Sequence, residues 1–589
     1  MKKIFITLII FFVGFNLKAQ YVLFNDAKLT DKLKTIYPNC FDRYNQLDTT
    51  CPEVQATRRL DLSRSQISDL FNINKAFSRL IFLNVSDNNL TMLPTLPSSL
   101  IELMASSNNI SVMPTNLPSS LKSLDLSYCK RIISITNLPP NLEELVLANY
   151  NLTSITAPFP ASLKSLNIQG CGLKTINPLP SGLIHFFCAG VPFQSLPTLP
   201  SGLQTLDCSA MTNGYIKNPG LIPSSLKSLY TEYNDLTTLT SLPPNLEEFR
   251  CNFSTLKNNS LLPLPSSLRK LECAYCNIST LPILPSSLKH LDVQYNFIRQ
   301  LALPNSLEYL DCSHNPILNL PSLPVNLKDL RYKEGICSSV PPLPSSLEQL
   351  NLSYCAFLTS LPALPSTLKR LYVDHSSLTN LPSLPNNITD LNASYTFITE
   401  IQNVPDSIVY MGFKNTPLRY LPELYSKNKL LSLDVVNTDI NCLPFLPDQI
   451  KNLYVSGSYI SCLPNWPSSF PLNSRIYIYN SLVGYRELTA YNPCTSDCTA
   501  SNSYIDLEGF CKIGPNPTNK DLFITFNSLT ESNLEVSLYN SLGQLVFNDA
   551  IPEGQTEHKI NLLAYNQGLY HLVIKQNKVM IGKKTIIKE

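Results

Sequence analysis

The chain has 589 residues, and its 45 Lys and Arg against 43 Asp and Glu leave a formal net charge of +2. A chain so close to neutral lacks the strong positive field that attracts nucleic acid, so we expect no nucleic acid among its partners. Hydrophobic residues make up 44% of the chain and charged residues 15%, which excludes general disorder. Its 46 Pro against 18 Gly disfavour long helices and glycine-rich phosphate-binding loops.

The first residues have the order of a secretory signal peptide. Lys2 and Lys3 precede the apolar residues 4–15, and Ala19 offers a small residue for cleavage. This apolar run is too short to cross about 30 Å of hydrocarbon as a helix. We therefore expect a signal peptide at residues 1–19 and no transmembrane segment in the mature chain.

Residues 20–57 follow no repeat and contain two cysteines, Cys40 and Cys51. Small regions without a large core are often held together by disulfides in oxidising compartments. We expect an N-terminal cap here with a disulfide between Cys40 and Cys51, and the connectivity of the other cysteines stays open.

A repeated motif fills residues 58–475. The string Leu-Pro-Ser-Ser-Leu, or a close variant, recurs from Leu60 to Phe470, and we use its last residue as the anchor of each repeat. Twenty-one anchors have a mean spacing of about 20.5 residues, which is typical of a solenoid, here with about 20 repeats.

Each repeat carries the same apolar pattern. The anchor and the residues three and five positions after it (+3 and +5) are apolar, as at Leu121, Leu124 and Leu126. This alternation predicts a short strand that buries these side chains and turns +2, +4 and +6 outward, with +7 at the rim. Asn, Cys, Ser or Thr at +8 is expected to bond the turning backbone. Prolines near +14 and +17 predict a polyproline-like return path.

This pattern resembles the leucine-rich repeat, in particular the short, proline-rich class of bacterial proteins. The resemblance covers residues 58–475. It implies a mainly β fold, a leucine-rich repeat solenoid with a parallel-strand concave sheet and a polyproline-like convex side. Some effectors with similar repeats carry a large α-helical ubiquitin-ligase domain. No segment of this chain fits that domain, so the resemblance does not extend to ligase activity.

The composition changes again after residues 476–512, which we interpret as a C-terminal cap and linker. Residues 513–589 contain alternating stretches that predict strands and a small β-sandwich. The candidate strands are residues 522–526, 534–539, 545–547, 569–575 and 579–588.

Four motifs of this tail resemble the C-terminal sorting domain of the type IX secretion system. They are residues 515–518, 542–544, 568–572 and 582–588. In that family the domain directs a folded periplasmic protein through the outer membrane of a diderm bacterium and is then usually removed. The resemblance implies that residues 513–589 contact the type IX secretion machinery and that the protein is secreted or lies on the outer cell surface. The alternative is an ordinary β-sandwich that stabilises the solenoid.

Seventeen cysteines and six histidines raise the question of metal or catalytic chemistry. Cysteines recur at +5 and +8, which indicates packing, because zinc needs four convergent ligands. Asp374, His375 and Ser376 are adjacent, but adjacency does not orient a catalytic relay. Glu272 and Asp292 stand at +4 of neighbouring repeats, near enough for the two carboxylates of a carbohydrate-cleaving pair. Adjacent acids of this kind are, however, usually solvated surface residues without a catalytic role. We expect no catalytic residue, no metal and no cofactor.

The remaining candidates are outward residues of the predicted sheet, where tyrosine is frequent and charges lie between the tyrosines. Tyrosine offers rigid, amphipathic contact area and is enriched in binding hot spots. The candidate partner-binding residues are Tyr230, Tyr233, Arg250, Glu272, Tyr275, Asp292, Tyr295, Tyr309, Asp311, Arg331, Tyr354, Tyr372 and Tyr395. We expect a non-enzymatic protein that binds a protein or glycan through its concave face, with adhesion as the working hypothesis. The alternative is a soluble inhibitor or decoy of a secreted enzyme or host receptor.

Overall fold

The computed structural model describes residues 21–588 with gaps at 115, 130, 149–150, 194, 211–220, 238, 257–260, 461, 464, 471–475, 481–483, 489–510, 529, 531–533, 541–544 and 577–578. The expected signal peptide, residues 1–19, lies outside the described residues. The chain divides into two compact units, residues 1–316 and 317–589, which we describe one at a time. None of the helices in the described ranges is long and apolar enough to cross a membrane.

The first unit begins with a short cap-like segment. Its elements are β1 (Tyr21–Val22), α1 (Ala27–Ile36), β2 (Leu47–Asp48) and α2 (Pro52–Ala56). Helix α1 starts at Asp26, whose carboxylate accepts the Leu29 backbone N–H at 2.9 Å. The other oxygen of Asp26 accepts the Ser68 backbone N–H at 2.6 Å and the Ser68 hydroxyl at 2.7 Å, which connects α1 to the first repeat. A disulfide joins Cys40 to Cys51, with their Cα atoms 5.7 Å apart.

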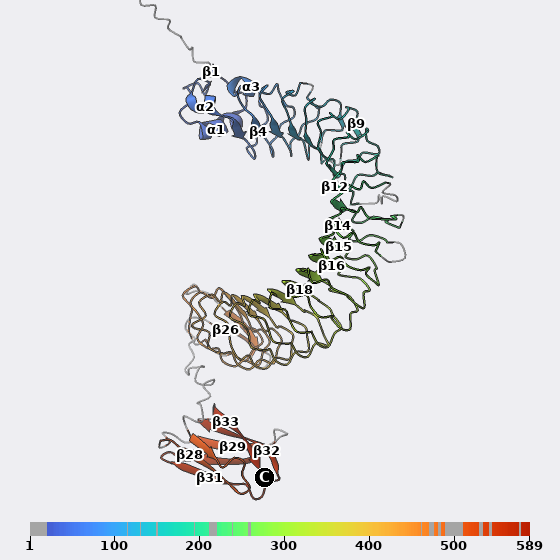
Figure 1. Cartoon of the computed structure of the whole chain (residues 1–589). Coiled ribbons are helices and arrows are strands. Elements are labelled where there is room, and N and C mark those ends of the chain that lie inside the picture. The colour runs from blue at the N-terminus through green and yellow to red at the C-terminus, as the bar shows by residue number, and fades with distance from the viewer. Residues whose placement is uncertain are drawn as a thin grey trace, which may run out of the picture. The chain divides into compact units, whose positions relative to one another are not determined.

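Thirteen described strands of the first unit then form one parallel sheet, in chain order and one strand per repeat (Figure 1). They are β3 (Arg59–Asp61), β4 (Phe82–Asn84), β5 (Glu102–Met104), β6 (Ser123–Asp125), β8 (Glu144–Val146), β10 (Ser165–Asn167), β11 (His185–Phe187), β12 (Thr205–Asp207), β13 (Ser228–Tyr230), β14 (Glu248–Arg250), β15 (Lys270–Glu272), β16 (His290–Asp292) and β17 (Tyr309–Asp311). Helix α3 (Ile73–Ala76) and the pair β7 (Ser134–Ile135) and β9 (Ser154–Ile155) lie between strands of this sheet in the chain.

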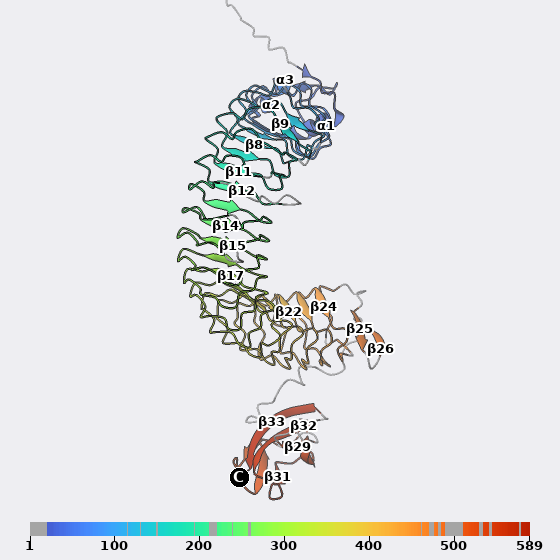
Figure 2. The same cartoon turned by 90° about the vertical axis from the view of Figure 1, so that its right-hand side faces the viewer.

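The predicted inward positions are confirmed. Leu121, Leu124 and Leu126 are all buried, and the middle residue of each strand lies opposite the middle residue of the next, as Leu271 does with Leu291. The strands follow one another at regular intervals along the unit (Figure 2). Each coil therefore buries its apolar edge against its two neighbours, and a single coil has no core of its own.

The register of the first repeat differs from the prediction. Leu60 pairs with Leu83, so Leu60 occupies position +3 and is not an anchor. The first repeat lacks the Leu-Pro-Ser-Ser-Leu string, and Leu60 has nearly the spacing of the anchors in the other repeats, so the sequence alone does not distinguish the two positions.

The residue at +8 bonds the turning backbone, as predicted. The Asn296 side-chain nitrogen donates to the carbonyls of Cys273 at 2.8 Å and Val293 at 2.9 Å. Its side-chain oxygen accepts the backbone N–H groups of Cys276 and Ile278, both at 3.0 Å. Cys276, itself at +8, donates its thiol to the Cys251 carbonyl at 2.9 Å. The side chain at +8 thus satisfies buried backbone groups of neighbouring coils.

The Pro-Ser-Ser-Leu string has a structural role that the sequence analysis did not assign. The Leu100 backbone N–H donates to the Pro97 carbonyl at 3.1 Å, which closes a turn. The Ser99 hydroxyl donates to the Leu80 carbonyl of the preceding coil at 2.7 Å. Ser120, Ser162, Ser225, Ser267 and Ser287 make the same bond to the preceding anchor carbonyl. A column of hydroxyls therefore joins consecutive coils on the loop side.

The second unit contains seven described parallel strands of the same kind. They are β18 (Asp329–Arg331), β19 (Gln349–Asn351), β20 (Arg370–Tyr372), β21 (Asp390–Asn392), β22 (Tyr410–Gly412), β23 (Ser432–Asp434) and β24 (Asn452–Tyr454). Cys442 and Cys462 are both disulfide-bonded and stand at +12 of consecutive repeats. The sequence analysis did not single them out.

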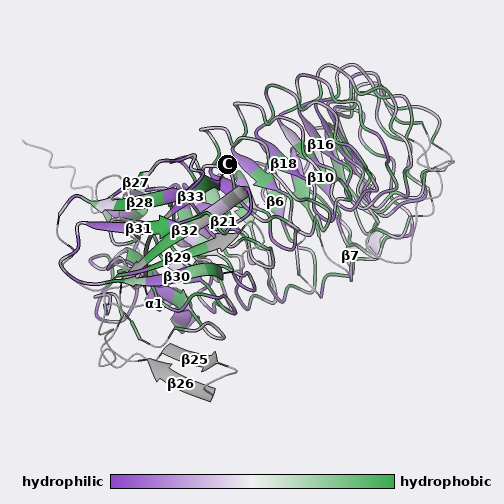
Figure 3. Cartoon of the chain, turned by 90° about the horizontal axis from the view of Figure 1, so that it is seen from below, coloured by the Kyte–Doolittle hydropathy of each residue, from purple (hydrophilic) through white to green (hydrophobic). Residues whose placement is uncertain are grey.

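Antiparallel strands complete the second unit. Strand β25 (Ile476–Asn480) pairs with β26 (Gly484–Leu488). The tail has one sheet in the order β27 (Cys511–Gly514), β28 (Asp521–Phe526), β31 (Glu557–Asn561), and another in the order β30 (Leu545–Ile551), β29 (Leu534–Asn540), β32 (Gly568–Gln576), β33 (Val579–Lys588). Hydrophobic and hydrophilic residues both occur along these strands (Figure 3). Leu522, Ile560 and Leu572 are among the core residues that both sheets share, so the predicted all-β tail is confirmed.

Candidate functional site

Positions +2 and +4 flank the buried +3 residue of each strand and therefore face outward. In the first unit the parallel register aligns them in two columns across neighbouring strands. One column contains Glu248, Lys270, His290 and Tyr309, and the other contains Tyr230, Arg250, Glu272, Asp292 and Asp311. We call these nine residues the concave floor.

The first part of the concave floor is a closed set of ion pairs. Glu248 accepts the Tyr230 hydroxyl at 2.8 Å and is paired with the Arg250 guanidinium at 2.7 Å. The same guanidinium lies over the Tyr230 ring at 4.9 Å and 3.6 Å from Glu272. Lys270 lies 2.8 Å from Glu272 and 3.4 Å from Glu248. Both cations are thus fully engaged by these two carboxylates.

Histidine and tyrosine extend this set. The His290 Nε2 atom lies 3.5 Å from the Glu272 carboxylate, and the His290 ring stacks on Tyr309 at 4.1 Å. The hydrogen bond with His290, together with Lys270 and Arg250, lowers the pKa of Glu272 to about 2, although burial acts in the opposite direction. Glu272 is therefore a permanently charged, fully engaged carboxylate, which does not fit the nucleophile or the acid of a carbohydrate-cleaving pair.

Asp292 and Asp311 differ from the other carboxylates of the floor. Asp292 accepts the Gln294 backbone N–H at 3.1 Å and the Gln294 side-chain amide at 3.0 Å, and Asp311 accepts the Ser313 backbone N–H at 3.0 Å. Asp311 is only 5% exposed. Burial, reinforced by the charges of Asp311 and Glu272, raises the pKa of Asp292 to about 6. This end of the floor therefore carries negative charge that amide donors solvate and that no cation of the described residues neutralises.

At +7, just beyond the strands, aromatic rings form a continuous stack, which we call the aromatic ladder. Its members are Tyr233, Phe253, Tyr275, Tyr295 and His314. Successive ring centroids are 4.6, 4.5, 4.0 and 3.7 Å apart, and the rings are nearly parallel. Tyr233 is 47% exposed, Phe253 43%, Tyr275 41% and Tyr295 36%. The ladder is thus an exposed aromatic ridge beside the concave floor.

The backbone at +7 makes this ridge unusual. All five ladder residues have φ between 54° and 59°, the left-handed region that Gly, Asn and Asp adopt most readily. Six other repeats have Asp, Asn or Gly at this position, namely Asp87, Gly170, Gly190, Asn415, Asn437 and Gly457, and three have Ser107, Tyr128 or Glu334. Neither the backbone nor the core therefore explains why bulky rings stand at this position in five successive repeats.

The second unit has a shorter stack of the same kind. Tyr354, His375 and Tyr395 stack at 4.0 and 4.1 Å. The buried Asp374 carboxylate lies 3.1 Å from His375 Nδ1 and accepts the Ser353 hydroxyl at 2.6 Å. Ser376 donates its hydroxyl to the Val373 carbonyl at 2.7 Å and so does not take part in a relay with His375. His375 is thus oriented for stacking between two tyrosines.

The predicted partner-binding residues fall into two groups. The first unit brings together Tyr230, Tyr233, Arg250, Glu272, Tyr275, Asp292, Tyr295, Tyr309 and Asp311. The second unit holds Arg331, Tyr354, Tyr372 and Tyr395, and there Arg331 is paired with Asp329 at 3.0 Å. The sequence analysis missed Phe253, His314 and His375 as stack members, although all three share position +7 with the tyrosines.

Metal chemistry finds little support in the described residues. Their cysteines at +5 and +8 are buried, and burial raises the pKa of the Cys208 thiol well above its usual range. Among them, Cys40, Cys51 and Glu53 form the group close enough together to share a metal ion. Because both sulfurs of that group are joined in a disulfide, neither is a thiolate ligand.

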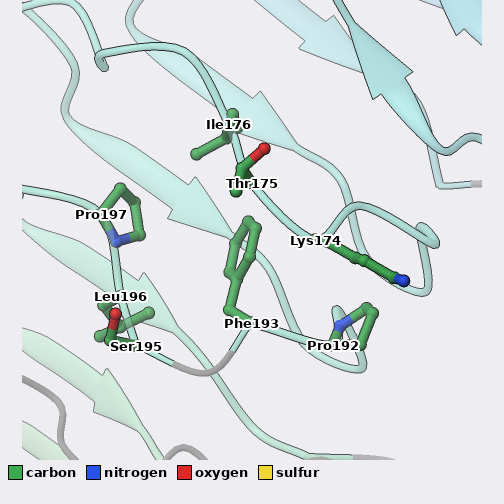
Figure 4. Close-up of a pocket in the computed structure, with 8 residues that line it drawn as sticks. All are labelled: Lys174, Thr175, Ile176, Pro192, Phe193, Ser195, Leu196 and Pro197. Carbon is green, nitrogen blue, oxygen red and sulfur yellow. The ribbon is translucent and has the colours of Figure 1, made fainter.

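A groove of about 610 Å³ lies on the loops that follow β10 and β11 (Figure 4). Its lining residues are Lys174, Thr175, Ile176, Pro192, Phe193, Ser195, Leu196 and Pro197. Lys174 is the one titratable group of this lining, so the groove offers no acid and base pair.

Comparisons with known proteins agree with this geometry. The family model described as the secretion system C-terminal sorting domain matches residues 512–588, and the leucine rich repeat model matches residues 306–330. No curated protein matches the chain.

The solved structures that are similar to the chain include three from bacteria. YopM from Yersinia enterocolitica WA-314 is 31% identical, with 70% of this chain and 90% of that chain covered and a TM-score of 0.55. YopM from Yersinia pestis, a leucine-rich effector protein, is 30% identical over 55% of this chain and 85% of that chain, with a TM-score of 0.43. The functional domain of InlJ from Listeria monocytogenes is 17% identical over 84% and 90%, with a TM-score of 0.34. Of these three, the Yersinia enterocolitica YopM structure has a TM-score above 0.5.

Proposed function

Because this chain belongs to the bacterial leucine-rich repeat proteins and ends in a type IX secretion C-terminal sorting domain, we propose that it is a secreted or cell-surface protein that recognises a protein or glycan. The repeat fold indicates a role in protein interaction, and the sorting domain implies export to the cell surface or beyond. We propose further that recognition takes place on the sheet side of the repeats and serves adhesion, without catalysis.

The observation that carries this proposal is the aromatic ladder. A ring at a left-handed backbone position costs about 1–2 kcal/mol relative to glycine, and burial does not compensate for it, because these rings remain exposed. Exposed, rigid, mutually stacked aromatic side chains are the kind of surface that binding hot spots use. A role in binding supplies the reason for rings at +7 that folding does not.

A non-enzymatic role agrees with the chemistry of the floor. A catalytic nucleophile or base must be free to reach a reacting atom. Glu248 and Glu272 are both engaged by Arg250 and Lys270, and Ser376 donates to a backbone carbonyl. These groups favour a preorganised contact surface.

The test compares the full chain with two variants on arrays of glycans and cell-surface proteins. The ladder variant carries Phe253→Asn, Tyr275→Asn and Tyr295→Asn, because asparagine tolerates the left-handed backbone. The matched control replaces three exposed aromatic residues outside the sheet, as Tyr44→Asn, Phe357→Asn and Tyr425→Asn. We expect the ladder variant to bind its array ligand at least about tenfold more weakly, and the control to bind like the unchanged chain.

The melting temperature of each variant separates binding from folding. We expect the ladder variant to keep its melting temperature, since lost stacking is offset by relief of the backbone conformation. Equal binding by the ladder variant and the unchanged chain would overturn the proposal. A single tight soluble ligand, in place of cell-surface ligands, would favour the inhibitor or decoy and overturn adhesion.

A further inference from the structure

We propose that the sheet face of β12–β17 in the first unit binds a basic, lysine- or arginine-rich segment of a protein partner. This inference rests on the proposed function and names the chemistry of the ligand. It also decides between the two ligand classes, protein and glycan, in favour of protein.

The sheet face of β12–β17 carries more carboxylates than cationic side chains. The outward positions +2, +4 and +6 of β12–β17 hold six carboxylates and two cationic side chains, whereas the whole chain has a formal net charge of +2. The carboxylates are Asp207, Glu232, Glu248, Glu272, Asp292 and Asp311, and the cations are Arg250 and Lys270. The rim position +1 before these strands holds three cations, Lys227, Arg269 and Lys289, against Glu247 and Glu308, and Lys227 pairs with Glu247 and Lys289 with Glu308. This face is therefore acidic on a chain that is slightly basic.

Four of the six carboxylates have no cationic partner among the described residues. Arg250 and Lys270 are engaged by Glu248 and Glu272. Asp207 accepts the Gln169 side-chain amide at 2.8 Å, and Glu232 accepts the Asn252 amide at 2.9 Å. Asp292 and Asp311 likewise accept only N–H groups of Gln294 and Ser313. These neutral N–H donors orient the carboxylates but do not neutralise their negative charge.

Two of these carboxylates, Asp292 and Asp311, are poorly exposed to water. Asp311 is buried and Asp292 is partly buried, so water screens their charges less than it screens surface carboxylates. Burial and, to a lesser extent, the crowding of negative charge from Asp311 and Glu272 raise the pKa of Asp292. A cation brought to this point would relieve that crowding and gain more than at an exposed acid.

The geometry of the aromatic ladder disfavours a sugar as the ligand. Sugars stack on the faces of aromatic rings, but the inner ladder rings lie 3.7–4.6 Å from their neighbours on both faces. What remains exposed is a row of ring edges and tyrosine hydroxyls. The apolar stem of a lysine or arginine fits such a row, while its charged end reaches the carboxylates of the floor.

The test measures binding of two fluorescently labelled peptides, nona-lysine and nona-glutamate, to the full chain by fluorescence anisotropy at 50 and 150 mM salt. The floor variant carries Asp292→Asn and Asp311→Asn, which keep a side-chain acceptor at both positions. The matched control carries Asp31→Asn and Glu557→Gln, two exposed carboxylates that do not belong to β12–β17, with the same change in net charge.

We expect nona-lysine to bind and nona-glutamate not to bind. The floor variant should bind nona-lysine about tenfold more weakly and the control less than about twofold more weakly, because only the first removes charge from the face. Equal losses in both variants would show non-specific attraction and overturn the inference, as would absent binding of nona-lysine. If the floor variant matches the unchanged chain while the ladder variant loses its array ligand, the inference fails and the proposed function stands. If the arrays identify a glycan ligand and the ladder variant no longer binds it, the inference likewise fails and the proposed function stands.

Discussion

Tyr233, Phe253, Tyr275 and Tyr295 have φ between 55° and 59°, a backbone conformation that glycine and asparagine adopt at lower cost. Each ring gains about 0.5–1.5 kcal/mol from each stacked neighbour, which offsets the conformational cost of about 1–2 kcal/mol. The two effects nearly cancel, so the rings contribute little net stability. The ladder is therefore a surface that folding tolerates and that the proposed binding role accounts for.

A second property of single residues is the pH dependence that Asp292 introduces. In the sheet it lies opposite Glu272 on β15 and Asp311 on β17, and the charges of both groups disfavour its ionised form. The pKa of Asp292 in the folded chain is raised to about 6 from its ordinary value of 3.8. Protonation of Asp292 therefore stabilises the folded state. Its stabilising effect is present at pH 4 and is lost as the pH rises through 6.

The substitution Asp292→Asn should therefore stabilise the chain above pH 6 only. We expect a gain of about 1 kcal/mol in the free energy of unfolding at pH 7.5 and no gain at pH 4. Thermal unfolding of both proteins at the two pH values measures this difference. A destabilised variant at pH 7.5, or the same gain at both values, would contradict the assigned environment of Asp292.

At the scale of elements, strands of three residues hold together because side chains on both sides satisfy the backbone between coils. The hydroxyl column of Ser99 and its equivalents does this on the loop side, and the residue at +8 does it at the turn. The position accepts several side chains, since Thr396 at +8 donates to the Ala393 carbonyl at 2.7 Å. Hydrogen-bonding capacity, more than shape, is what this position selects.

The substitution Asn296→Ala should consequently destabilise the first unit strongly. Asn296 is buried, and its loss removes the side-chain partner of the Cys273 carbonyl and of the Cys276 and Ile278 N–H groups, while the Val293 carbonyl keeps the Asn315 amide at 2.8 Å. We expect a decrease of about 3 kcal/mol in the free energy of unfolding, measured by urea denaturation followed by circular dichroism. The exposed Asn89→Ala serves as control and should change it by less than about 0.5 kcal/mol. A similar, small effect of both substitutions would show that the +8 column does not support the coils.

For the whole molecule, the sequence predicted the architecture well because the signals recur. A period of about 20 residues, repeated through the chain, defines inward positions even where one repeat is irregular. Five of the seven described tail strands were predicted to within a few residues, because alternation and turn residues mark their ends; for example, residues 534–539 were predicted and Leu534–Asn540 is observed. Strands β27 (Cys511–Gly514) and β31 (Glu557–Asn561) were not predicted. The first repeat was misregistered at Leu60 because it lacks the repeated string.

The candidate site was harder to predict, because its properties belong to neighbouring coils together. The sequence placed tyrosines at +7, but the stacking that includes Phe253 and His314 depends on the parallel register. Likewise, Arg250, Glu272 and Asp292 look alike as outward charges in the sequence. Only their neighbours distinguish engaged charges from unneutralised ones, and several of those neighbours, such as Glu272 for Arg250, lie about 20 residues away in the chain.

The central claim is that the ladder and the concave floor of the first unit contact the ligand. The most direct measurement is hydroxyl-radical footprinting of the full chain, free and bound to its array ligand, with oxidation of individual tyrosines read by mass spectrometry. We predict that Tyr275 and Tyr295 become protected on binding, while Tyr44 and Tyr425 are oxidised equally in both states. Unchanged oxidation of Tyr275 and Tyr295 in the bound state would contradict the account and move the contact surface elsewhere.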